Sequence, residues 1–239
     1  MSPTISLSDF GVHFPAFRLG PLDLDLQPGE RVALLGANGA GKSTTLRAIG
    51  GRLRNFTGSV RVFGEPVERQ IPAVRARIGF LAERLLGFGW MTVRQHLGFL
   101  QNFFPGWDAA YAEQLRDRLA LPEDARVGTL SKGMQVKLSL LAAEAHRPPI
   151  LLLDEPTSGI DPLMRGEILD LIRACVPEGS ERLVIFSSHL LEDVDQVARR
   201  VVLLKEGRLV ADTPIADLKA REPGAPLSRI LMQELKAHG

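Results

Sequence analysis

The sequence has almost no cysteine and no long apolar run. Cys175 is its one cysteine, which excludes an internal disulfide framework and any metal site built from several cysteines. The apolar runs are of strand length, far below the roughly 18 residues that a membrane-spanning helix needs. No long apolar core follows a basic start in residues 1–23, so no signal peptide is expected. These absences favour a cytoplasmic chain that reaches a membrane only through a partner.

The sequence has no marked excess of positive or negative charge. The chain has 29 lysines and arginines against 28 aspartates and glutamates, which gives a formal net charge of +1 at pH 7. Such a chain has no general attraction for nucleic acid, and no nucleic-acid partner is expected. Internal repeats, low-complexity tracts and long linkers are also missing. We therefore expect the 239 residues to form one domain with a substantial core.

What the sequence does contain is a glycine-rich loop between an apolar strand and a helix. Residues 36–44 match the phosphate-binding pattern G-x-x-x-x-G-K-[ST], after the apolar run 31–35 and before an expected helix over 44–49. Glycines let the chain turn so that successive N–H groups point at one anion, and the helix N-terminus adds partial positive charge. A chance glycine-rich turn is the alternative, but the strand and helix around the loop argue against it.

This loop supplies the expected phosphate-binding residues. They are Gly36, Asn38, Gly39, Ala40, Gly41, Lys42, Ser43 and Thr44. The Lys42 ammonium would reach the β- and γ-phosphates of a nucleotide, and the Ser43 hydroxyl would bind Mg²⁺.

Short strands are predicted on both sides of the loop. They are expected over residues 5–8, 21–26, 59–63, 78–81, 150–153, 183–186, 201–204 and 208–211. The first two alternate apolar and polar side chains, as half-buried strands do. The runs 150–153 and 183–186 are fully apolar, which is typical of a parallel sheet that is covered on both faces.

Helical patterns fill the block from about residue 85 to 145, with Thr92, Asp108 and Ser131 as helix N-caps. Another helix begins at Pro162, and a short helical piece is expected near 227–235. The predicted fold class is α/β. It has a P-loop NTPase core of a mostly parallel sheet with flanking helices, an antiparallel β subdomain and an inserted α-helical subdomain. The expected division is core 1–84 and 146–212, helical subdomain 85–145, and a C-terminal extension 213–239 without an assigned role.

An acidic pair ends the apolar run 150–153. Asp154 would hold Mg²⁺, directly or through water, and Glu155 is placed to polarise an attacking water. Two acids that merely end a strand in solvent are the alternative, and the phosphate loop upstream argues against it. His189 ends a neighbouring strand, at the sheet edge where open α/β sheets bind ligands, and is expected to sense the γ-phosphate.

Several other reactive or aromatic side chains are expected to be ordinary surface or core residues. They are His13, His96, His146, His238, Cys175, Phe10 and Phe17. Cys175 falls on the apolar stripe of a helix and has no adjacent histidine to activate it, so it is interpreted as a small core side chain. One of Phe10, Phe14 and Phe17 could instead stack on an adenine ring, because an aromatic face can stack on any base.

A second glycine-containing helix start lies at residues 130–134. It would be an anion site by the same physics as the phosphate loop. One chain that binds one nucleotide does not need two such sites. The second site makes sense if it closes over the nucleotide of another subunit.

With these motifs in this order, the sequence resembles the nucleotide-binding subunit of an ATP-binding-cassette (ABC) transporter over about residues 5–212. The matching segments are Gly36 to Thr44 with Walker A, Leu130 to Met134 with the family signature, Ile150 to Glu155 with Walker B and its catalytic glutamate, Ser158 to Asp161 with the D-loop, and His189 with the switch histidine. The resemblance implies that Phe14 is the aromatic residue that stacks on adenine. It also implies that Asp161 helps to couple two sites across a dimer.

The sequence departs from the family pattern at two motifs. The signature, usually Leu-Ser-Gly-Gly-Gln, has Lys132 and Met134 in this chain, but it keeps Ser131 and Gly133, which would touch the γ-phosphate. The position of the family's Q-loop glutamine holds Glu83, whose carboxylate would still bind Mg²⁺ or water. Both variants resemble those in subunits of bacterial exporters of the ABC-2 type.

The resemblance implies a subunit that binds and hydrolyses ATP, with Mg²⁺, to power a membrane transporter, most simply an exporter. Two cassettes, identical or different, would form a head-to-tail dimer with ATP between Walker A of one and the signature of the other. Transmembrane permease subunits would contact residues 84–105 and hold the chain at the inner face of the cell membrane.

Two other function classes remain open on the sequence alone. A soluble, non-transport ABC ATPase that serves as an assembly or repair factor would share every motif. A phosphate-loop kinase or GTPase is the weaker alternative, because it gives no role to residues 130–134, to residues 158–161 or to His189.

Overall fold

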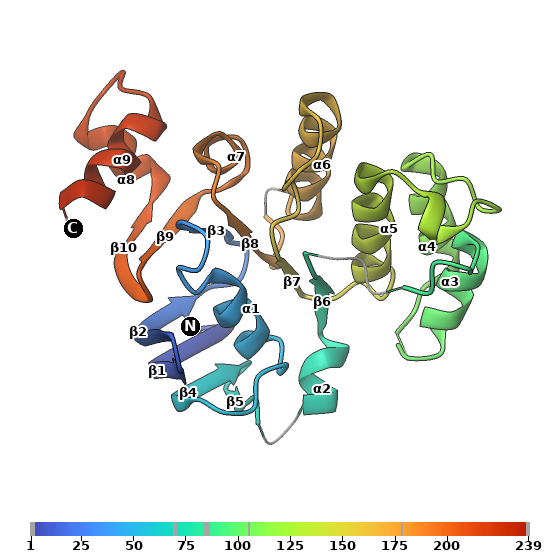
Figure 1. Ribbon diagram of the computed structural model, residues 1–239, viewed down its shortest axis with the longest axis horizontal. Helices are drawn as coiled ribbons and strands as arrows, with labels where there is room; N and C mark the ends of the chain where they lie inside the picture. Colours follow the sequence, from blue (N-terminus) through green and yellow to red (C-terminus); the bar gives the residue numbers. More distant parts are fainter. Residues whose placement is uncertain (1–2, 69–70, 84–86, 105, 178, 238–239) are drawn as a thin grey trace.

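In the part of the chain that the structure describes, the strands form two β-sheets, and helices surround the larger one (Figure 1). The structure is a computed structural model that describes residues 3–68, 71–83, 87–104, 106–177 and 179–237. The strands are β1 (Ile5–Phe14), β2 (Phe17–Leu26), β3 (Arg31–Leu35), β4 (Thr57–Val62), β5 (Glu65–Pro66), β6 (Ile78–Leu81), β7 (Ile150–Leu153), β8 (Leu183–Ser188), β9 (Arg200–Lys205) and β10 (Arg208–Pro214). The helices are α1 (Lys42–Ile49), α2 (Ile71–Ala76), α3 (Val93–Gln101), α4 (Ala109–Arg118), α5 (Lys132–Glu144), α6 (Pro162–Cys175), α7 (Leu191–Val197), α8 (Ile215–Arg221) and α9 (Leu227–Ala237), with a 3₁₀ turn at Val127–Thr129.

The larger sheet has the strand order β10-β9-β3-β8-β7-β6. Strand β3 pairs in parallel with β8 and β9, β7 pairs in parallel with β6 and β8, and β10 alone is antiparallel to its neighbour. The residues that follow β3, β7 and β8 therefore meet at one edge of the sheet. The predicted mostly parallel sheet is confirmed, and its carboxyl edge is where such sheets bind ligands.

The smaller sheet is antiparallel, with the order β2-β1-β4-β5. Strands β1 and β2 each have 10 residues and are longer than the sequence pattern predicted. The pairing of β1 with β2 shifts register between Leu7 and Phe10 and again between Phe10 and Val12. Such bulges break the two-residue alternation of side chains, so the pattern identifies only part of each strand.

Apolar side chains form a separate core on each face of the larger sheet. One face packs on α1 and on the antiparallel sheet, through residues such as Val32, Leu34 and Leu46. The other face packs on α6, α7 and α9, through residues such as Ala33 and Leu35. The alternation of Val32 to Leu35 between the two cores shows why this run of β3 is apolar at every position: neither face of the sheet reaches water there.

Helices α3, α4 and α5 lie between β6 and β7 in the sequence and form their own core around Leu138 and Leu141. The three predicted N-caps are confirmed: the side chains of Thr92, Asp108 and Ser131 accept the backbone N–H groups of Gln95, Tyr111 and Met134. In Figure 1 this helical segment lies at one side of the larger sheet, and α8 and α9 lie at the other.

Helices α2 and α8 were not expected, and both are short. Helix α2 has six residues and α8 has seven, too few for a hydrophobic period to stand out. Among the described residues, no helix combines the length and apolar character needed to cross a bilayer.

Candidate functional site

The phosphate loop connects β3 to α1, as its sequence pattern predicts. Gly41 precedes the first residue of α1 with φ of 108°, and a Cβ atom there would lie 2.4 Å from Cδ1 of Leu19. Only glycine fits both this conformation and this space. The Lys42 side chain folds back along the loop and donates to the carbonyl oxygens of Gly36 at 2.8 Å and Ala37 at 3.2 Å. The lysine charge is therefore held over the loop.

A cavity of about 940 Å³ opens beside the loop. Its wall includes Asn38 and Gly39 of the loop, Phe17 of β2 and Arg208 of β10. The Phe14 side chain is 43% exposed, and its ring stacks on Phe17 with the centroids 6.4 Å apart. Of the two rings, Phe17 lines the cavity directly.

The expectation of core packing was correct for Phe10 and incomplete for Phe17. The Phe10 side chain is fully buried, and its ring lies 5.5 Å from that of Phe56. Phe17 is only partly buried, and it contacts the core as well as the cavity.

Asp154 follows β7, and its side chain is buried, at 1% exposure. Its Oδ1 atom accepts the Ser43 hydroxyl at 2.7 Å and the Ser187 hydroxyl at 2.9 Å. Its N–H donates to the carbonyl of Leu81. Hydrogen bonds from both neighbours satisfy a buried carboxylate that would otherwise destabilise the fold. Asp154 therefore links the phosphate loop to strand β8.

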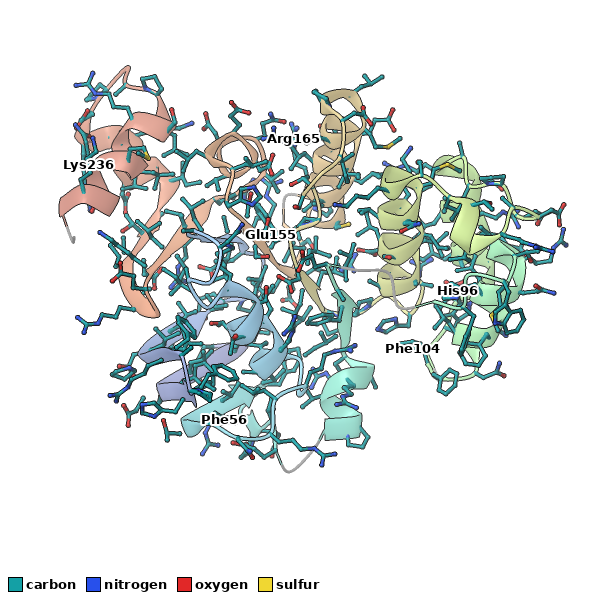
Figure 2. All side chains as sticks on the ribbon, viewed as in Figure 1. Phe56, His96, Phe104, Glu155, Arg165 and Lys236 are labelled. Atoms are coloured by element: carbon teal, nitrogen blue, oxygen red, sulfur yellow. The ribbon has the colours of Figure 1, made fainter. Side chains whose placement is uncertain are left out.

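Glu155 turns its carboxylate back toward the loop. Its φ of 49° lies in the left-handed region, which costs a non-glycine residue of order 1 kcal/mol or more. The Ser187 hydroxyl accepts the Glu155 N–H at 2.8 Å and holds this turn. Oε1 lies 3.1 Å from Nζ of Lys42, and Oε2 lies 2.8 Å from Nδ1 of His189. Three predicted residues, from the start of α1 and from the segments that follow β7 and β8, thus meet in one cluster. Figure 2 shows Glu155 near the middle of the molecule.

The structure adds a buried group that the sequence interpretation missed. Asp193 of α7 is fully buried and accepts hydrogen bonds from Thr157 at 2.5 Å, Ser188 at 3.2 Å and Arg165 at 2.6 Å. Thr157 follows Glu155 by two residues, and Ser188 directly precedes His189. Asp193 therefore joins the two segments that carry the site. The sequence did indicate that Asp193 is buried. Residues four apart lie on the same face of a helix, and Asp193 precedes the apolar Val197 by four residues on the buried face of α7.

In the described part of the chain, the remaining predicted residues form no hydrogen bond or ion pair with Lys42, Glu155 or His189. Ser131 caps α5, Asp161 caps α6 through the Met164 N–H, and Glu83 is exposed. Gly133 is buried against Met164, where a Cβ atom would lie 2.4 Å from Cγ. Within the described ranges none of these four residues hydrogen-bonds to the phosphate loop.

The oxygen atoms next to the phosphate loop supply only part of a Mg²⁺ coordination shell. The described residues include no cluster of three or more His, Cys, Asp or Glu side chains that could hold a metal. Ser43 Oγ and Asp154 Oδ1, 2.7 Å apart, offer two oxygen donors at one point. Mg²⁺ is commonly bound by one or two protein groups and completed by water and substrate phosphates. These residues therefore fit a metal that arrives with a nucleotide.

The other described histidines and Cys175 do not line the cavity beside the phosphate loop. His13 is exposed on β1, whereas His96 and His146 are buried, and His238 lies outside the described residues. Burial raises the pKa of the Cys175 thiol well above its usual value, and the carboxylate of Glu144 raises it further. This environment agrees with the prediction of an unreactive core cysteine.

Comparisons with known proteins agree with this geometry. Residues 19–158 match the family model described as ABC transporter. The Nod factor export ATP-binding protein I of Paraburkholderia xenovorans (strain LB400) is 34% identical over 215 residues, which cover 87% of this chain and 70% of that protein. The daunorubicin/doxorubicin resistance ATP-binding protein DrrA of Streptomyces peucetius is 34% identical over 217 residues, which cover 83% of this chain and 61% of that protein.

A solved structure described as the ATP binding subunit of an ABC transporter superimposes with a TM-score of 0.84 at 25% identity. The superposition covers 97% of this chain and 99% of that one. The motifs, the fold and the matched family agree along most of the sequence. The chain therefore belongs to the ABC transporter family, as one of its ATP-binding and ATP-hydrolysing subunits.

Proposed function

We propose that this chain powers an exporter of the ABC-2 type by hydrolysing ATP as one cassette of a dimer that is bound to a membrane-spanning permease. The cluster of Lys42, Glu155 and His189, with contacts of 3.1 Å and 2.8 Å, is the observation that carries this proposal. It supplies a cation for phosphate, a base for water and a second group at the γ-phosphate position. A kinase transfers the phosphoryl group to a substrate other than water, so it does not need a base that deprotonates water.

The proposed chemistry is an in-line attack of water on the γ-phosphorus of ATP, which breaks the bond to the β-phosphate oxygen. Glu155 takes a proton from the water, Lys42 stabilises the negative charge of the phosphates, and His189 orients Glu155 and binds the γ-phosphate. Ser43, Asp154 and Glu83 would hold Mg²⁺, which when bound neutralises charge on the β- and γ-phosphates. Phe14 would stack on the adenine.

A second cassette is proposed to complete the site. Ser131 and Gly133 stand at the N-terminus of α5, where backbone N–H groups attract an anion, and they make no contact with the phosphate loop of their own chain in the described ranges. In a head-to-tail dimer these residues would cover the γ-phosphate held by the partner. Asp161 would lie between the two sites.

The proposal of export draws on the two relatives named above, one described by Nod factor export and the other by drug resistance. The proposal of a permease partner draws on the surface of the helical segment. Phe88, Trp90, Phe99 and Phe103 are exposed and form a continuous row, with neighbouring ring centroids 5.0–5.7 Å apart. An exposed aromatic row of this kind is typical of a protein-binding surface. The permease would hold the chain at the inner face of the membrane.

The enzymatic part is tested by Glu155→Gln. We expect the variant to lose steady-state ATP hydrolysis by about 10²-fold or more while it still binds ATP, because the amide keeps the shape of the side chain but cannot accept the proton. It should accumulate as an ATP-bound dimer in size-exclusion chromatography. Glu167→Gln, an exposed acid on α6, is the matched control. Retained hydrolysis in Glu155→Gln would exclude the assigned role.

The transport part is tested by purifying the tagged chain from detergent-solubilised membranes of its source cells. We expect a multi-span membrane protein in stoichiometric amount. If the chain is absent from the membrane fraction and only soluble partners accompany it, the non-transport alternative is correct.

A further inference from the structure

Positive charge is concentrated in one stretch of the sequence. Residues 47–77 contain seven arginines and two glutamates, with no lysine and no aspartate, so the stretch has a formal net charge of +5 where the whole chain has +1. The other residues together are therefore net negative. A near-neutral protein with its charge divided in this way has a field that attracts anions to one region only.

The fold gathers this stretch at one end of the molecule. It runs from the end of α1 through β4 and β5 to α2, and Figure 1 shows these four elements together in the lower part of the view. Six of the seven arginines are described, and all six are exposed: Arg47, Arg52, Arg54, Arg61, Arg75 and Arg77. We call their surface the arginine face. Glu65 and Glu68 are exposed as well, so the described part of the face has an excess of four positive charges.

Neutral groups order two of these side chains. The Arg77 guanidinium lies 3.3 Å from the centre of the Phe63 ring, and Arg61 donates to the carbonyl oxygen of Gly64 at 2.9 Å. Arg200, outside the face, instead pairs with a carboxylate. No described aspartate or glutamate forms an ion pair with an arginine of the face. A guanidinium has five N–H donors, so contact with a ring or one carbonyl leaves donors for an anion.

Two arginines of the face lie close enough to repel each other. Partial burial lowers the pKa of Arg52, and the charge of Arg75 lowers it further. Arg75 donates to the carbonyl oxygen of Gly51 at 2.8 Å, which holds it beside the end of α1. The fold therefore brings like charges together without a described counter-ion. An anion that binds beside them relieves this repulsion.

We infer that the arginine face binds the phosphate groups of anionic phospholipids at the inner surface of the cell membrane. The inference rests on the proposed function, because the permease would hold the chain at that surface. Phe103 of the exposed aromatic row lines one cavity together with Arg52 and Arg75, so the arginine face begins beside the proposed permease contact. Arginine binds phosphate through two parallel N–H contacts, and a lipid surface offers many phosphates at once.

The aromatic side chains of the face favour a lipid surface over single-stranded nucleic acid. Proteins that bind such strands stack bases on free aromatic rings. The Arg77 guanidinium covers the Phe63 ring, and the Phe56 ring, labelled in Figure 2, packs on that of Phe10 with the centroids 5.5 Å apart. Attraction to anionic lipid needs charge near the surface and no stacking ring.

The full chain without the permease is sufficient for the first test. It is mixed with vesicles made of equal parts of phosphatidylcholine and phosphatidylglycerol, or of phosphatidylcholine alone, and the bound fraction is measured by sedimentation. We expect binding to the anionic vesicles only, and this binding should weaken as salt is added, because salt screens exposed charges. Equal binding to both kinds of vesicle, or to neither, overturns the inference.

A quadruple variant tests the arginines and leaves Arg52 and Arg75 in place, since these two also line the cavity beside the helical segment. The variant is Arg47→Gln/Arg54→Gln/Arg61→Gln/Arg77→Gln, with all four changes at exposed positions. Its affinity for the anionic vesicles should fall at least about 10-fold, because each arginine near an anionic surface adds to the attraction. Its ATP affinity, which reports an intact fold, should not change. Vesicle binding equal to that of the wild type contradicts the inference.

A matched control removes the same charge from other surfaces. It is Arg118→Gln/Arg126→Gln/Arg173→Gln/Arg229→Gln, four exposed arginines outside the stretch 47–77. The control should keep most of its affinity for the anionic vesicles. A loss as large as that of the quadruple variant would mean that net charge alone causes the binding, and the inference fails.

Two competing partners are tested with the same proteins. Polyuridylate, at a phosphate concentration equal to that of the lipid, should leave most of the chain on the vesicles. If it binds the chain as tightly as the vesicles do, the face is a nucleic-acid site and the inference is wrong. In detergent, the quadruple variant should retain the membrane protein that accompanies the wild type. Loss of that protein from the variant overturns this inference alone, whereas its absence from the wild-type preparation overturns the proposed function.

Discussion

The Lys42 ammonium lies 3.1 Å from the Glu155 carboxylate, and these side chains are only 5% and 10% exposed. The lysine is the expected cation for the β- and γ-phosphates, and the glutamate is the expected base. The two groups that the reaction needs therefore neutralise each other across the end of the phosphate loop. A phosphate that binds Lys42 has to compete with Glu155.

This competition predicts that Glu155→Gln binds ADP more tightly than the wild type. An amide attracts the ammonium less than a carboxylate does, so less interaction energy is lost when the phosphate binds. We expect an affinity gain of about 3- to 10-fold, or about 0.7–1.4 kcal/mol. Calorimetric titration with ADP measures it, and Glu167→Gln is the control. An unchanged or weaker affinity would mean that the Lys42–Glu155 contact does not oppose binding.

Removing the cation itself should have the opposite effect. Lys42→Ala is expected to lose ATP binding by about 10²-fold, because a charge-assisted contact to phosphate is worth about 1.5–3 kcal/mol. The control is Lys219→Ala, which removes a half-exposed lysine paired with Asp195 on the surface. The same calorimetric assay applies. Wild-type affinity in Lys42→Ala would refute the role assigned to this lysine.

The buried carboxylate of Asp193 should contribute to both stability and turnover. Asp193→Asn leaves the Arg165 guanidinium without its 2.6 Å carboxylate partner, and we expect the free energy of unfolding to fall by about 2–4 kcal/mol. Turnover should fall as well, because Thr157 and Ser188 lose the group that joins their segments. Urea unfolding and ATPase assays measure the two effects. Asp195→Asn, on the exposed side of the same helix, should change stability by less than about 1 kcal/mol.

The N-cap of α4 should make the helical segment sensitive to acid. The Tyr111 N–H and the Arg147 guanidinium bind the Asp108 carboxylate and hold its pKa below the usual value. The folded state therefore binds the Asp108 proton less readily than the unfolded chain does. The stabilisation that the ionised Asp108 provides is fully present when the pH is above the pKa of Asp108 in the unfolded chain. It is lost as the pH falls through the lower pKa of Asp108 in the folded state.

The variant Asp108→Asn removes the negative charge but keeps the helix N-cap, because asparagine is also a good N-cap residue. The urea midpoint of this variant should fall less between pH 6 and pH 3 than that of the wild type. Asp124→Asn, an exposed acid near α3, should behave as the wild type does. A steeper acid dependence in Asp108→Asn would contradict a lowered pKa of Asp108 in the folded state.

The thiol of Cys175 should be slow to react. Its raised pKa keeps the thiolate scarce, and its Sγ–H donates to the carbonyl of Leu171 at 3.2 Å. We expect the folded protein to react with Ellman's reagent at pH 8 at least about 10-fold more slowly than the urea-unfolded chain. Cys175→Ser gives the background rate. Equal rates in the folded and unfolded protein would show that the thiol is accessible.

Local signals were sufficient for much of the fold. The glycine spacing before Lys42, the fully apolar run 150–153 and the N-caps Thr92 and Asp108 each depend on neighbours in the sequence, and each is found in the structure where predicted. Strand lengths were less well predicted. The bulges in β1 and the short helices α2 and α8 have no period that a window of sequence can resolve.

Contacts across the sheet could not be predicted from the sequence. The side-chain distances that link Glu155 to Lys42 and to His189 depend on the order of strands β3, β8 and β7 and on a left-handed turn at residue 155. The role of Asp193 depends on which face of α7 meets the sheet. The same holds for the buried His96 and His146, since sequence alone assigns a lone histidine no particular neighbour.

The family, the motifs and the chemical types of the groups at the nucleotide follow from the amino-acid sequence alone, because glycine conformation, charge and hydrogen-bonding capacity belong to single residues. The pairing of Glu155 with Lys42, and the link that Asp193 makes between the two segments of the site, are visible only in the folded chain. These relationships join residues far apart in the chain, and packing of the sheet and helices fixes the distances on which electrostatic interactions depend.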